Sequence, residues 1–563
     1  MAPHSCCVPA ALEDAREVLK RFFGYPDFRP AQLPVVESVL AGRDTLAVLP
    51  TGGGKSICYQ VPALVTSGLT VVISPLISLM KDQVDRLTSR GVAAAFLNST
   101  LDPAQVRESV GRIVAGELRL LYLAPERFEA ADLQRTLAGR VALLAVDEAH
   151  CISEWGHDFR PSFRRIADVA AQIGSPQTIA LTATATPAVR ADIARQLRLR
   201  SPRVIVQGFD RENLHYAVSR CRNDSDKDHA LLAGLRRHER PAIVYAATRS
   251  TVQRLATQLT RWGVPALPYH AGLDDEHRRD VQDRFMRGAV DTIVATNAFG
   301  MGIDKPDVRL VLHYTMPGTL EAYYQEAGRA GRDGRPARCI LLHAYKDRFT
   351  HEWFINATFP ERADVERTYV KLGRSAVDGV AASVSRDDGA AVRLLLQERV
   401  LLQSRGGTLA HVRVLATPHR IRRELSVSRS PAPLAVMRAL WRARVYESFV
   451  GVRVDLATLP RMPAPRSARD ALAWLRDHQF IDFTMIGDGV RLADPGASLE
   501  RFHIDWDSLR RRKQADLAKL DAMQKYAFTS NCRRAFVLRY FGEQGCAARC
   551  SGCDNCLRQT SRE

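Results

Sequence analysis

The sequence contains no run of about 18 consecutive apolar residues, so it offers no segment of the kind that crosses a membrane as a helix. Its first residues, Met1 to Cys7, lack the positive charge and the apolar stretch of a secretory signal. We therefore expect a cytoplasmic protein with no membrane partner. Because cysteines stay reduced in that compartment, the 11 cysteines are expected to be thiols or metal ligands rather than disulfides.

Lysine is also scarce: only ten of the 80 basic residues are Lys, although the net charge is +18. Such an excess of positive charge attracts polyanions, with nucleic acid as the first candidate and an anionic membrane as the second. A GC-rich genome would favour Arg without any selection for binding, so charge alone leaves the question open. The length of 563 residues predicts about three or four domains.

Two long stretches, residues 1–208 and 209–356, alternate short apolar runs with helical patterns. The runs in the first stretch lie at 70–74, 118–123 and 141–146, and those in the second at 242–245, 291–295 and 310–312. Apolar, β-branched runs between helical segments are typical of parallel sheets covered by helices on both faces. The sequence therefore predicts an α/β fold with two parallel-sheet domains in tandem.

Residues 357–505 have a different pattern. A helix running into a strand is predicted over 391–403, and a Gly-rich turn then leads into an alternating strand over 409–414. A helix followed by a hairpin indicates a winged helix, and any other small α+β domain remains the alternative.

A similar unit follows, in which Ser467 is expected to cap a helix and two strands, 480–483 and 490–492, to form a hairpin. Between the two units, residues 420–444 carry seven Arg and one Glu. This stretch is expected to be either a DNA-facing surface or a solvated linker.

A glycine-rich segment, Leu49 to Ser56, directly follows the strand-like run Thr45–Val48. Glycines let backbone amides surround phosphate oxygens, Lys55 supplies a cation to the phosphates, and the Ser56 hydroxyl can hold Mg²⁺. The strict phosphate-binding pattern has Gly where Leu49 stands, and a turn without a ligand is the alternative. The candidate nucleotide-binding residues in this segment are Thr51, Gly52, Gly53, Gly54, Lys55 and Ser56.

Two carboxylates, Asp147 and Glu148, follow the apolar run that ends at Val146. At the end of a buried strand, Asp147 would bind Mg²⁺ through water and Glu148 would polarise the attacking water of a phosphoryl transfer. Such a pair is common on solvated surfaces, and only the glycine-rich segment makes it specific.

Four cysteines near the C-terminus have the spacing of a zinc site: Cys532, Cys550, Cys553 and Cys556. Four thiolates can enclose one Zn²⁺ tetrahedrally and fill every position, which predicts a structural site without catalysis. Cys546 is a fifth candidate that could replace Cys532 as a ligand. Free thiols on a helix are the alternative.

Several segments between about residues 15 and 350 resemble the RecQ helicases of superfamily 2. They are Phe23–Tyr25, Phe28–Gln32, Ser74–Gln83, Asp147–Pro161, Leu181–Thr186, Tyr269–Leu273, Phe299–Pro306 and Tyr324–Gly334. The resemblance implies two RecA-like domains and a helical zinc-binding subdomain over 506–563, with the winged-helix-like region predicted from the pattern of 357–505 between them. In the commonest family order the zinc subdomain precedes the winged helix, whereas here the zinc cluster comes last.

The resemblance also implies an activity: an ATP-dependent helicase that moves 3′ to 5′ on single-stranded DNA, unwinds duplex DNA and serves DNA repair or recombination. Its cofactors would be ATP, Mg²⁺ and Zn²⁺. The alternatives are an RNA helicase, a translocase that does not unwind, and a zinc-containing nucleic-acid-binding protein with an inactive motor. The sequence does not indicate protein partners, oligomeric state or the preferred DNA structure.

Further site residues follow from the same resemblance. Tyr25 would stack on adenine while Arg29 and Gln32 contact its edge, and Asp304 would belong to the nucleotide site. A capped turn after an amphipathic helix over 12–22 is the alternative reading of the first three.

Arginines of the second lobe, Arg329 and Arg332, would reach the γ-phosphate across the cleft and stabilise the transition state when the lobes close. Surface arginines are the alternative. The loop after the carboxylates resembles the family's aromatic-rich loop, which implies DNA contact through Trp155, His157, Phe159 and Arg160. Buried aromatics and a core histidine would be its ordinary explanation.

Overall fold

The structure is a computed structural model that divides into two compact units, one comprising residues up to Glu352 together with 514–563 and the other Trp353–Lys513. It describes residues 7–50, 52–75, 77–98, 101–153, 155–156, 160–300, 305–375, 389–404, 409–425, 431–448, 451–456, 458–459, 465–485, 489–494, 497–543 and 546–560. Within these ranges no helix combines the length and the apolar character needed to cross a membrane.

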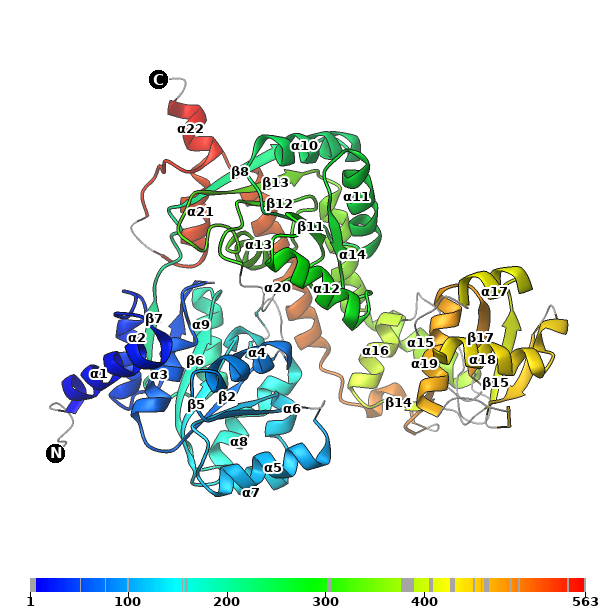
Figure 1. Cartoon of the computed structure of the whole chain (residues 1–563), viewed down its shortest axis with the longest axis horizontal. Helices are drawn as coiled ribbons and strands as arrows, with labels where there is room; N and C mark the ends of the chain where they lie inside the picture. Colours follow the sequence, from blue (N-terminus) through cyan, green and yellow to red (C-terminus); the bar gives the residue numbers. More distant parts are fainter. Residues whose placement is uncertain are drawn as a thin grey trace. The chain divides into compact units, whose positions relative to one another are not determined.

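The first lobe is built on a seven-stranded, all-parallel sheet with the order β3-β4-β2-β5-β6-β1-β7. Figure 1 shows this lobe in blue and cyan, with helices around the strands. Its strands are β1 (Thr45–Val48), β2 (Leu69–Ile73), β3 (Ala94–Leu97), β4 (Leu120–Leu123), β5 (Val141–Val146), β6 (Gln177–Thr182) and β7 (Arg203–Val206). The strands β1, β2 and β4 are buried along their whole length, as expected for apolar runs covered on both faces.

Helices connect these strands. They are α1 (Cys7–Val18), which continues as a π-helical turn (Leu19–Phe23), α2 (Leu33–Leu40), α3 (Ile57–Val65), α4 (Ile77–Thr88), α5 (Pro103–Val114), α6 (Pro125–Phe128), α7 (Ala131–Leu137), α8 (Ile166–Gln172) and α9 (Pro187–Gln196), with 3-10 turns at Ala149–Ile152 and Pro161–Arg165. The core joins α1, α2 and α3 to one face of the sheet through buried residues such as Leu19, Val36 and Tyr59.

The second lobe repeats this plan with a six-stranded parallel sheet in the order β10-β11-β9-β12-β13-β8. Its elements are β8 (Leu214–Arg220), α10 (Asp224–Arg237), β9 (Ala242–Tyr245), α11 (Arg249–Arg261), β10 (Leu267–Tyr269), α12 (Asp275–Met286), β11 (Thr292–Ala295), β12 (Leu310–His313), α13 (Leu320–Ala327), β13 (Ala337–His343) and α14 (Asp347–Thr358). The two parallel-sheet domains predicted from the apolar runs are therefore confirmed.

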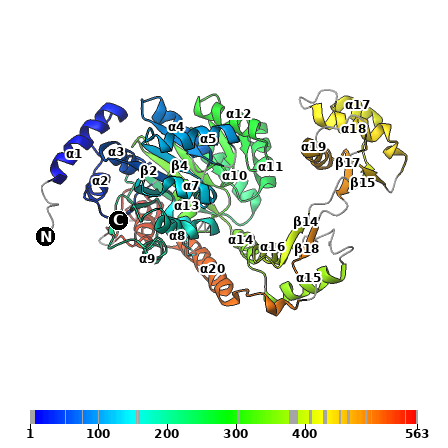
Figure 2. The same ribbon diagram turned by 90° about the horizontal axis from the view of Figure 1, so that it is seen from below.

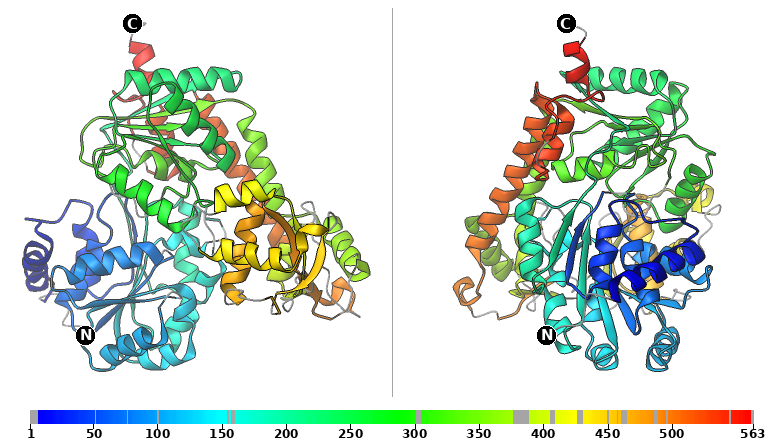
Figure 3. Two further views of the ribbon diagram at one scale, coloured as in Figure 1. Left: turned by 45° about the vertical axis from the view of Figure 1, so that its right-hand side comes forward. Right: turned by 90° about the vertical axis from the view of Figure 1, so that its left-hand side faces the viewer.

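The C-terminal segment packs on the edge of the second sheet. It contains α20 (Trp506–Phe528), α21 (Arg533–Tyr540) and α22 (Asp554–Thr560). The edge strand β8 is extended by a bridge between Tyr216 and Cys553, and the Tyr216 N–H donates to the carbonyl of Gly552 at 2.9 Å. Figure 3 shows α20 in orange, running beside the strands and helices of the lobes.

The second unit contains one small α+β fold nested inside another. The outer fold consists of α15 (Arg362–Ser375), α16 (Gly389–Gln397), β14 (Leu401–Ser404), β18 (Gly489–Leu492) and a 3-10 turn (Leu499–Arg501). The inner fold has its own core and consists of β15 (Leu409–Val414), α17 (Pro418–Leu425), α18 (Pro431–Arg442), a 3-10 turn (Val445–Glu447), β16 (Val452–Asp455), α19 (Pro465–Asp477) and β17 (Ile481–Met485). Figure 2 shows the two groups, with β14 and β18 beside α15 and α16.

This nesting corrects two predictions. The expected hairpins do not form, because β14 pairs with β18, whereas β15 pairs with β16 and β17. Each strand pairs with a strand of the same hydrophobic core rather than with the strand that follows it in the sequence. The helix expected to start after Ser467 begins at Pro465, so Ser467 lies inside it rather than capping it. The outer fold still has helices followed by an antiparallel strand pair, with the inner fold inserted in the connection.

Candidate active site and metal centre

The glycine-rich segment connects the end of β1, which lies between β6 and the edge strand β7, to the start of α3. Gly52 and Gly54 have φ angles of 81° and 73°, which favour glycine. A Cβ on Gly53 would lie 2.9 Å from the carbonyl oxygen of Pro50, so no side chain fits there without movement. The segment therefore has the compact backbone that a phosphate cradle needs. Thr51 lies outside the described residues.

Arg29 and Gln32 brace this cradle. The Gln32 amide accepts a hydrogen bond from the Arg29 N–H at 2.9 Å and donates to the carbonyls of Gly53 and Gly54, both at 3.1 Å. The Arg29 guanidinium donates to the Gly52 carbonyl at 2.5 Å. Sequence reasoning missed this bracing, because it assigned both side chains to the base of the nucleotide. Tyr25 is 49% exposed and therefore accessible to a ligand. The adenine contacts remain predictions.

The carboxylates lie where the apolar run predicted, directly after β5 ends at Val146. Asp147 is only 9% exposed, and its Oδ1 accepts the Glu148 N–H at 2.9 Å. Burial and the neighbouring Glu148 charge raise the pKa of Asp147 to about 6. A cation beside the carboxylate would offset both effects, so the site suits the Mg²⁺ that Asp147 and Ser56 were predicted to hold. Lys55 already lowers this pKa through its charge.

Glu148 has a φ of 49°, an uncommon conformation for a residue with a side chain and one that is concentrated at functional sites. Its Oε2 lies 3.3 Å from Nδ1 of His150, and the same nitrogen lies 2.9 Å from Oγ1 of Thr182. Burial lowers the pKa of His150, but Cys151 and Glu148 outweigh it and raise the pKa. His150 therefore orients Glu148, a role that its place beside the carboxylates could have suggested.

The second lobe contributes Arg332 to the cradle. A Cβ built on Gly52 would lie 3.5 Å from Cγ of Arg332. Nearby, the Gln325 side chain donates to Oγ1 of Thr184 in the first lobe at 3.3 Å. Arg329 is buried and packs within its own lobe, where its Nη2 lies 3.4 Å from a Cβ built on Gly300. The structure thus brings Arg332 to the glycine-rich segment, and the reach of Arg329 to the nucleotide remains a prediction. Asp304 lies outside the described residues.

The loop after the carboxylates is described in part. Trp155 is 41% exposed, and its N–H donates to the Ser153 hydroxyl at 3.2 Å. The Arg160 guanidinium donates to the carbonyl of Pro75 at 3.1 Å, which ties the end of the loop to the segment that follows β2. His157 and Phe159 lie outside the described residues. Contact of this loop with DNA remains a prediction.

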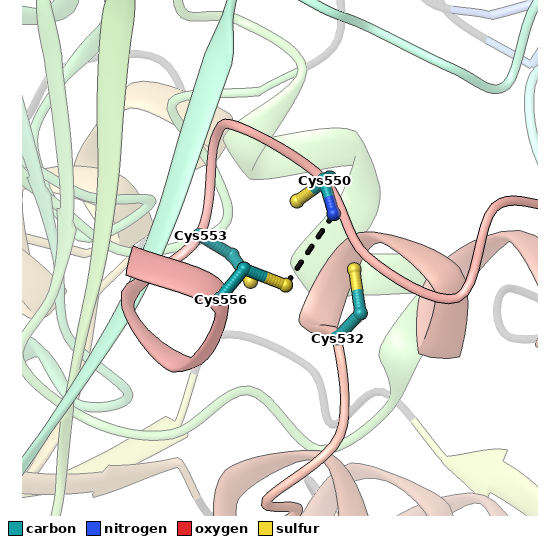
Figure 4. A group of neighbouring side chains, drawn as sticks. All are labelled: Cys532, Cys550, Cys553 and Cys556. Carbon is teal, nitrogen blue, oxygen red and sulfur yellow. Dashed lines mark hydrogen bonds between the residues drawn. The ribbon is translucent and has the colours of Figure 1, made fainter. Parts of the chain in front are cut away.

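Four thiols gather at the C-terminal segment, with the sulfur atoms of Cys532, Cys550, Cys553 and Cys556 all within 4.8 Å of one another (Figure 4). Tetrahedral Zn²⁺ with bonds of about 2.3 Å places its sulfur ligands roughly 3.8 Å apart, so the cluster fits that ion. Burial raises the pKa of Cys550 and of Cys556, and a bound cation would hold both as thiolates.

Cys546, the alternative first ligand, is outside this cluster, and its thiol donates to the Glu543 carbonyl at 3.2 Å. Cys532 belongs to the cluster and caps the start of α21, where its sulfur accepts the Ala535 N–H at 3.5 Å.

Three family models match the chain. The DEAD/DEAH box helicase model covers residues 29–193, the Helicase conserved C-terminal domain covers 226–334 and the RecQ zinc-binding model covers 497–557. Their order follows that of the two lobes and the cysteine cluster. The second compact unit lies almost entirely between the second and third matches.

Curated relatives agree with these matches. The ATP-dependent DNA helicase RecQ of Bacillus subtilis (strain 168) is 44% identical over 370 residues, which are 65% of this chain and 62% of that protein. The chain therefore spans just under two thirds of that relative. Among solved structures, the DUF1998 helicase MrfA bound to DNA and AMPPNP has a TM-score of 0.52 and 19% identity over 62% of this chain and 53% of that one, which supports the fold alone.

This chain matches a further relative over most of that relative's length. The probable ATP-dependent DNA helicase RecS of Bacillus subtilis (strain 168) is 40% identical over 365 residues, which are 63% of this chain and 73% of that protein. Together with the RecQ zinc-binding match over residues 497–557, this identity shows that the chain belongs to the RecQ family of helicases.

Proposed function

We propose that the protein is an ATP-dependent DNA helicase that moves 3′ to 5′ along single-stranded DNA and unwinds duplex DNA in repair or recombination, in the cytoplasm at the nucleoid. The observation that carries this proposal is the approach of Arg332, from the second lobe, to Gly52 of the first. A nucleotide held there contacts both lobes, so its hydrolysis changes how they hold each other. The names of the RecQ relatives support DNA as the polymer.

Hydrolysis follows from the residues around the cradle. The amides of the glycine-rich segment and Lys55 would hold the phosphates, and Ser56 and Asp147 would hold Mg²⁺, which would supply charge neutralisation at the phosphates. Glu148, oriented by His150 at 3.3 Å, positions the attacking water. Because Arg332 belongs to the other lobe, its charge reaches the transition state only when the lobes are together.

Movement along DNA then comes from alternating grip. ATP closes the lobes, and hydrolysis with product release opens them, so one lobe holds the strand while the other advances. Among the described residues of this loop, Trp155, which is 41% exposed, is the side chain best placed to stack on bases. The polarity rests on the family resemblance.

The zinc centre has a structural role in this proposal. Zn²⁺ bound by Cys532, Cys550, Cys553 and Cys556 would fasten the segment that extends β8. Every coordination position would be filled by a thiolate, which leaves no open position for water or substrate. Zn²⁺ would stabilise the fold of the C-terminal segment, and the reaction would take place at the nucleotide site.

The test is strand displacement on duplexes with a 3′ or a 5′ tail, in DNA and in RNA form, with ATP and Mg²⁺. The native chain should unwind the 3′-tailed DNA duplex. Lys55→Ala should not, whereas Lys525→Ala, a lysine exposed on α20, should behave as native. Equal unwinding by the native chain and Lys55→Ala would contradict the proposal. Preference for RNA would indicate an RNA helicase, and DNA-stimulated ATP turnover without displacement would indicate a translocase.

A further inference from the structure

Lys519, on α20, is a buried lysine outside the motifs of the nucleotide site. It is 8% exposed, and its Nζ donates to the carbonyl oxygen of Gly156 at 2.8 Å and to Oδ1 of Asp516 at 3.0 Å. A buried ammonium is costly unless its protons are satisfied, so these two acceptors hold the side chain in place. Gly156 lies in the first lobe, eight residues after Glu148.

The helix that carries Lys519 is fastened to the second lobe. Asp521 accepts a hydrogen bond from Arg348 at 2.7 Å, and the Tyr526 hydroxyl donates to that of Tyr323 at 3.0 Å in the interior. Lys519 therefore extends from an element held by one lobe to the backbone of the other.

The backbone at Gly156 lies close against the catalytic segment and leaves no space for a side chain. A Cβ there would lie 2.3 Å from the His150 carbonyl oxygen, and the Gly156 N–H donates to the Ser153 carbonyl at 2.9 Å. His150 in turn lies 3.3 Å from the Glu148 carboxylate. A short series of direct contacts thus runs from the Lys519 ammonium through Gly156 and His150 to Glu148.

We propose that Lys519 is a positioning residue for ATP hydrolysis. It fixes the turn at Gly156 against His150, and His150 holds Glu148 where the attacking water is activated. Because α20 is attached to the second lobe, the contact depends on the arrangement of the lobes and makes the Glu148 geometry depend on it too. This inference rests on the proposed ATPase function and adds a route from the C-terminal segment to the reacting groups.

The consequence is specific to turnover. A misplaced general base lowers kcat while the phosphate cradle still binds ATP, so KM changes little. If Lys519 were only structural, its substitution would lower the thermal midpoint, and kcat would fall only because less protein is folded.

The experiment uses the full-length, zinc-loaded chain with saturating single-stranded DNA and measures kcat, KM for ATP and thermal midpoint. Lys519→Met keeps the length of the side chain and removes its donors, and Lys519→Arg restores donors. Lys525→Met changes an exposed lysine of the same helix, and Leu520→Ala opens a cavity beside Lys519, where Leu520 is 0% exposed.

We expect Lys519→Met to lower kcat about tenfold with KM within twofold, the effect of one lost charge-assisted hydrogen bond on the barrier. Lys519→Arg should recover part of the rate and Lys525→Met should match the native chain. Leu520→Ala should have a lower thermal midpoint than the native chain, while the kcat of the folded protein should change little.

Native kcat in Lys519→Met would overturn the inference and leave the proposed function standing. The inference would also be overturned if kcat fell in proportion to the thermal midpoint, and to the same extent in Lys519→Met and Leu520→Ala. A native chain without ATP turnover would overturn the proposed function and this inference together.

Discussion

The side chain of Arg332 lies against Gly52, with Cγ 3.5 Å and Cδ 3.6 Å from the position of a Cβ on that glycine. An arginine of one parallel-sheet lobe thus borders the phosphate cradle of the other. The cradle itself depends on backbone shape, since Gly52 has a φ of 81°.

Gly52→Ala should therefore weaken ATP binding. An alanine in the left-handed region costs roughly 1 kcal/mol, and relief of that strain would turn the amide away from the phosphates. We expect KM for ATP to rise several-fold in steady-state assays. Gly91→Ala is the matched control, because Gly91 has a φ of 79° with no atom within 4 Å of its Cβ position and lies outside the site. Equal KM values for the two variants would argue against a strained cradle.

We expect the hydrogen bonds of Gln32 to stabilise the glycine-rich segment. Gln32→Glu keeps the acceptor for the Arg29 N–H and replaces the donor to the carbonyls of Gly53 and Gly54 with a carboxylate oxygen. Repulsion between that oxygen and the two carbonyls should raise the dissociation constant for ATP about tenfold or more. Equilibrium binding of a fluorescent ATP analogue measures this. Native affinity in Gln32→Glu would mean that the bracing contributes nothing to nucleotide binding.

The cysteine cluster should hold one zinc ion per chain. Cys532→Ser and Cys553→Ser should each lose metal and lower the thermal midpoint, because the segment bridged to Tyr216 is no longer fastened. Cys546→Ser should keep the metal, since that thiol lies outside the cluster. Metal analysis of the purified variants decides the matter, and zinc retained in Cys532→Ser but lost in Cys546→Ser would reverse the ligand assignment.

Two histidines, His351 and His343, should each contribute less stability as the solution becomes acidic. Burial lowers the pKa of His351, whose Nε2 donates to the Met316 carbonyl at 2.5 Å, and burial also lowers that of His343. Above an unfolded pKa of about 6.5 both states are neutral; as pH falls through that value the unfolded chain takes up protons first, so the free energy of unfolding drops.

His351→Gln, which keeps a donor but does not titrate there, should therefore lose less of its thermal midpoint between pH 7.5 and pH 5.5 than the native chain does. An unchanged difference in His351→Gln would exclude His351 as a source of the pH dependence.

Local patterns were enough to predict the two parallel sheets, because buried strands such as β2 and β5 are continuous apolar runs bounded by turns. The glycine-rich segment was recognisable for the same reason, since its glycines, Lys55 and Ser56 are contiguous, and phosphate binding by this segment remains a prediction. The resemblance to RecQ helicases assigned Arg332 to the γ-phosphate; the structure has its side chain beside Gly52, and the phosphate contact remains a prediction.

Contacts between distant segments were not predictable. β14 pairs with β18 across the whole inner fold, and no local turn signal reveals a partner that far along the chain. Lys519 and Gly156 are 363 residues apart, so nothing near either residue indicates their hydrogen bond. Gln32 was assigned to the base because its chemistry allows it, and only three-dimensional placement shows its bonds to the cradle.

The most direct test of a nucleotide pocket shared by two lobes is single-turnover ATP hydrolysis by Arg332→Ala with saturating single-stranded DNA. Arg335→Ala, exposed three residues along, is the control. Loss of a transition-state arginine from the opposite lobe should slow hydrolysis about 10³-fold while ATP binding changes only a few-fold. Hydrolysis by Arg332→Ala at the rate of Arg335→Ala would contradict the account.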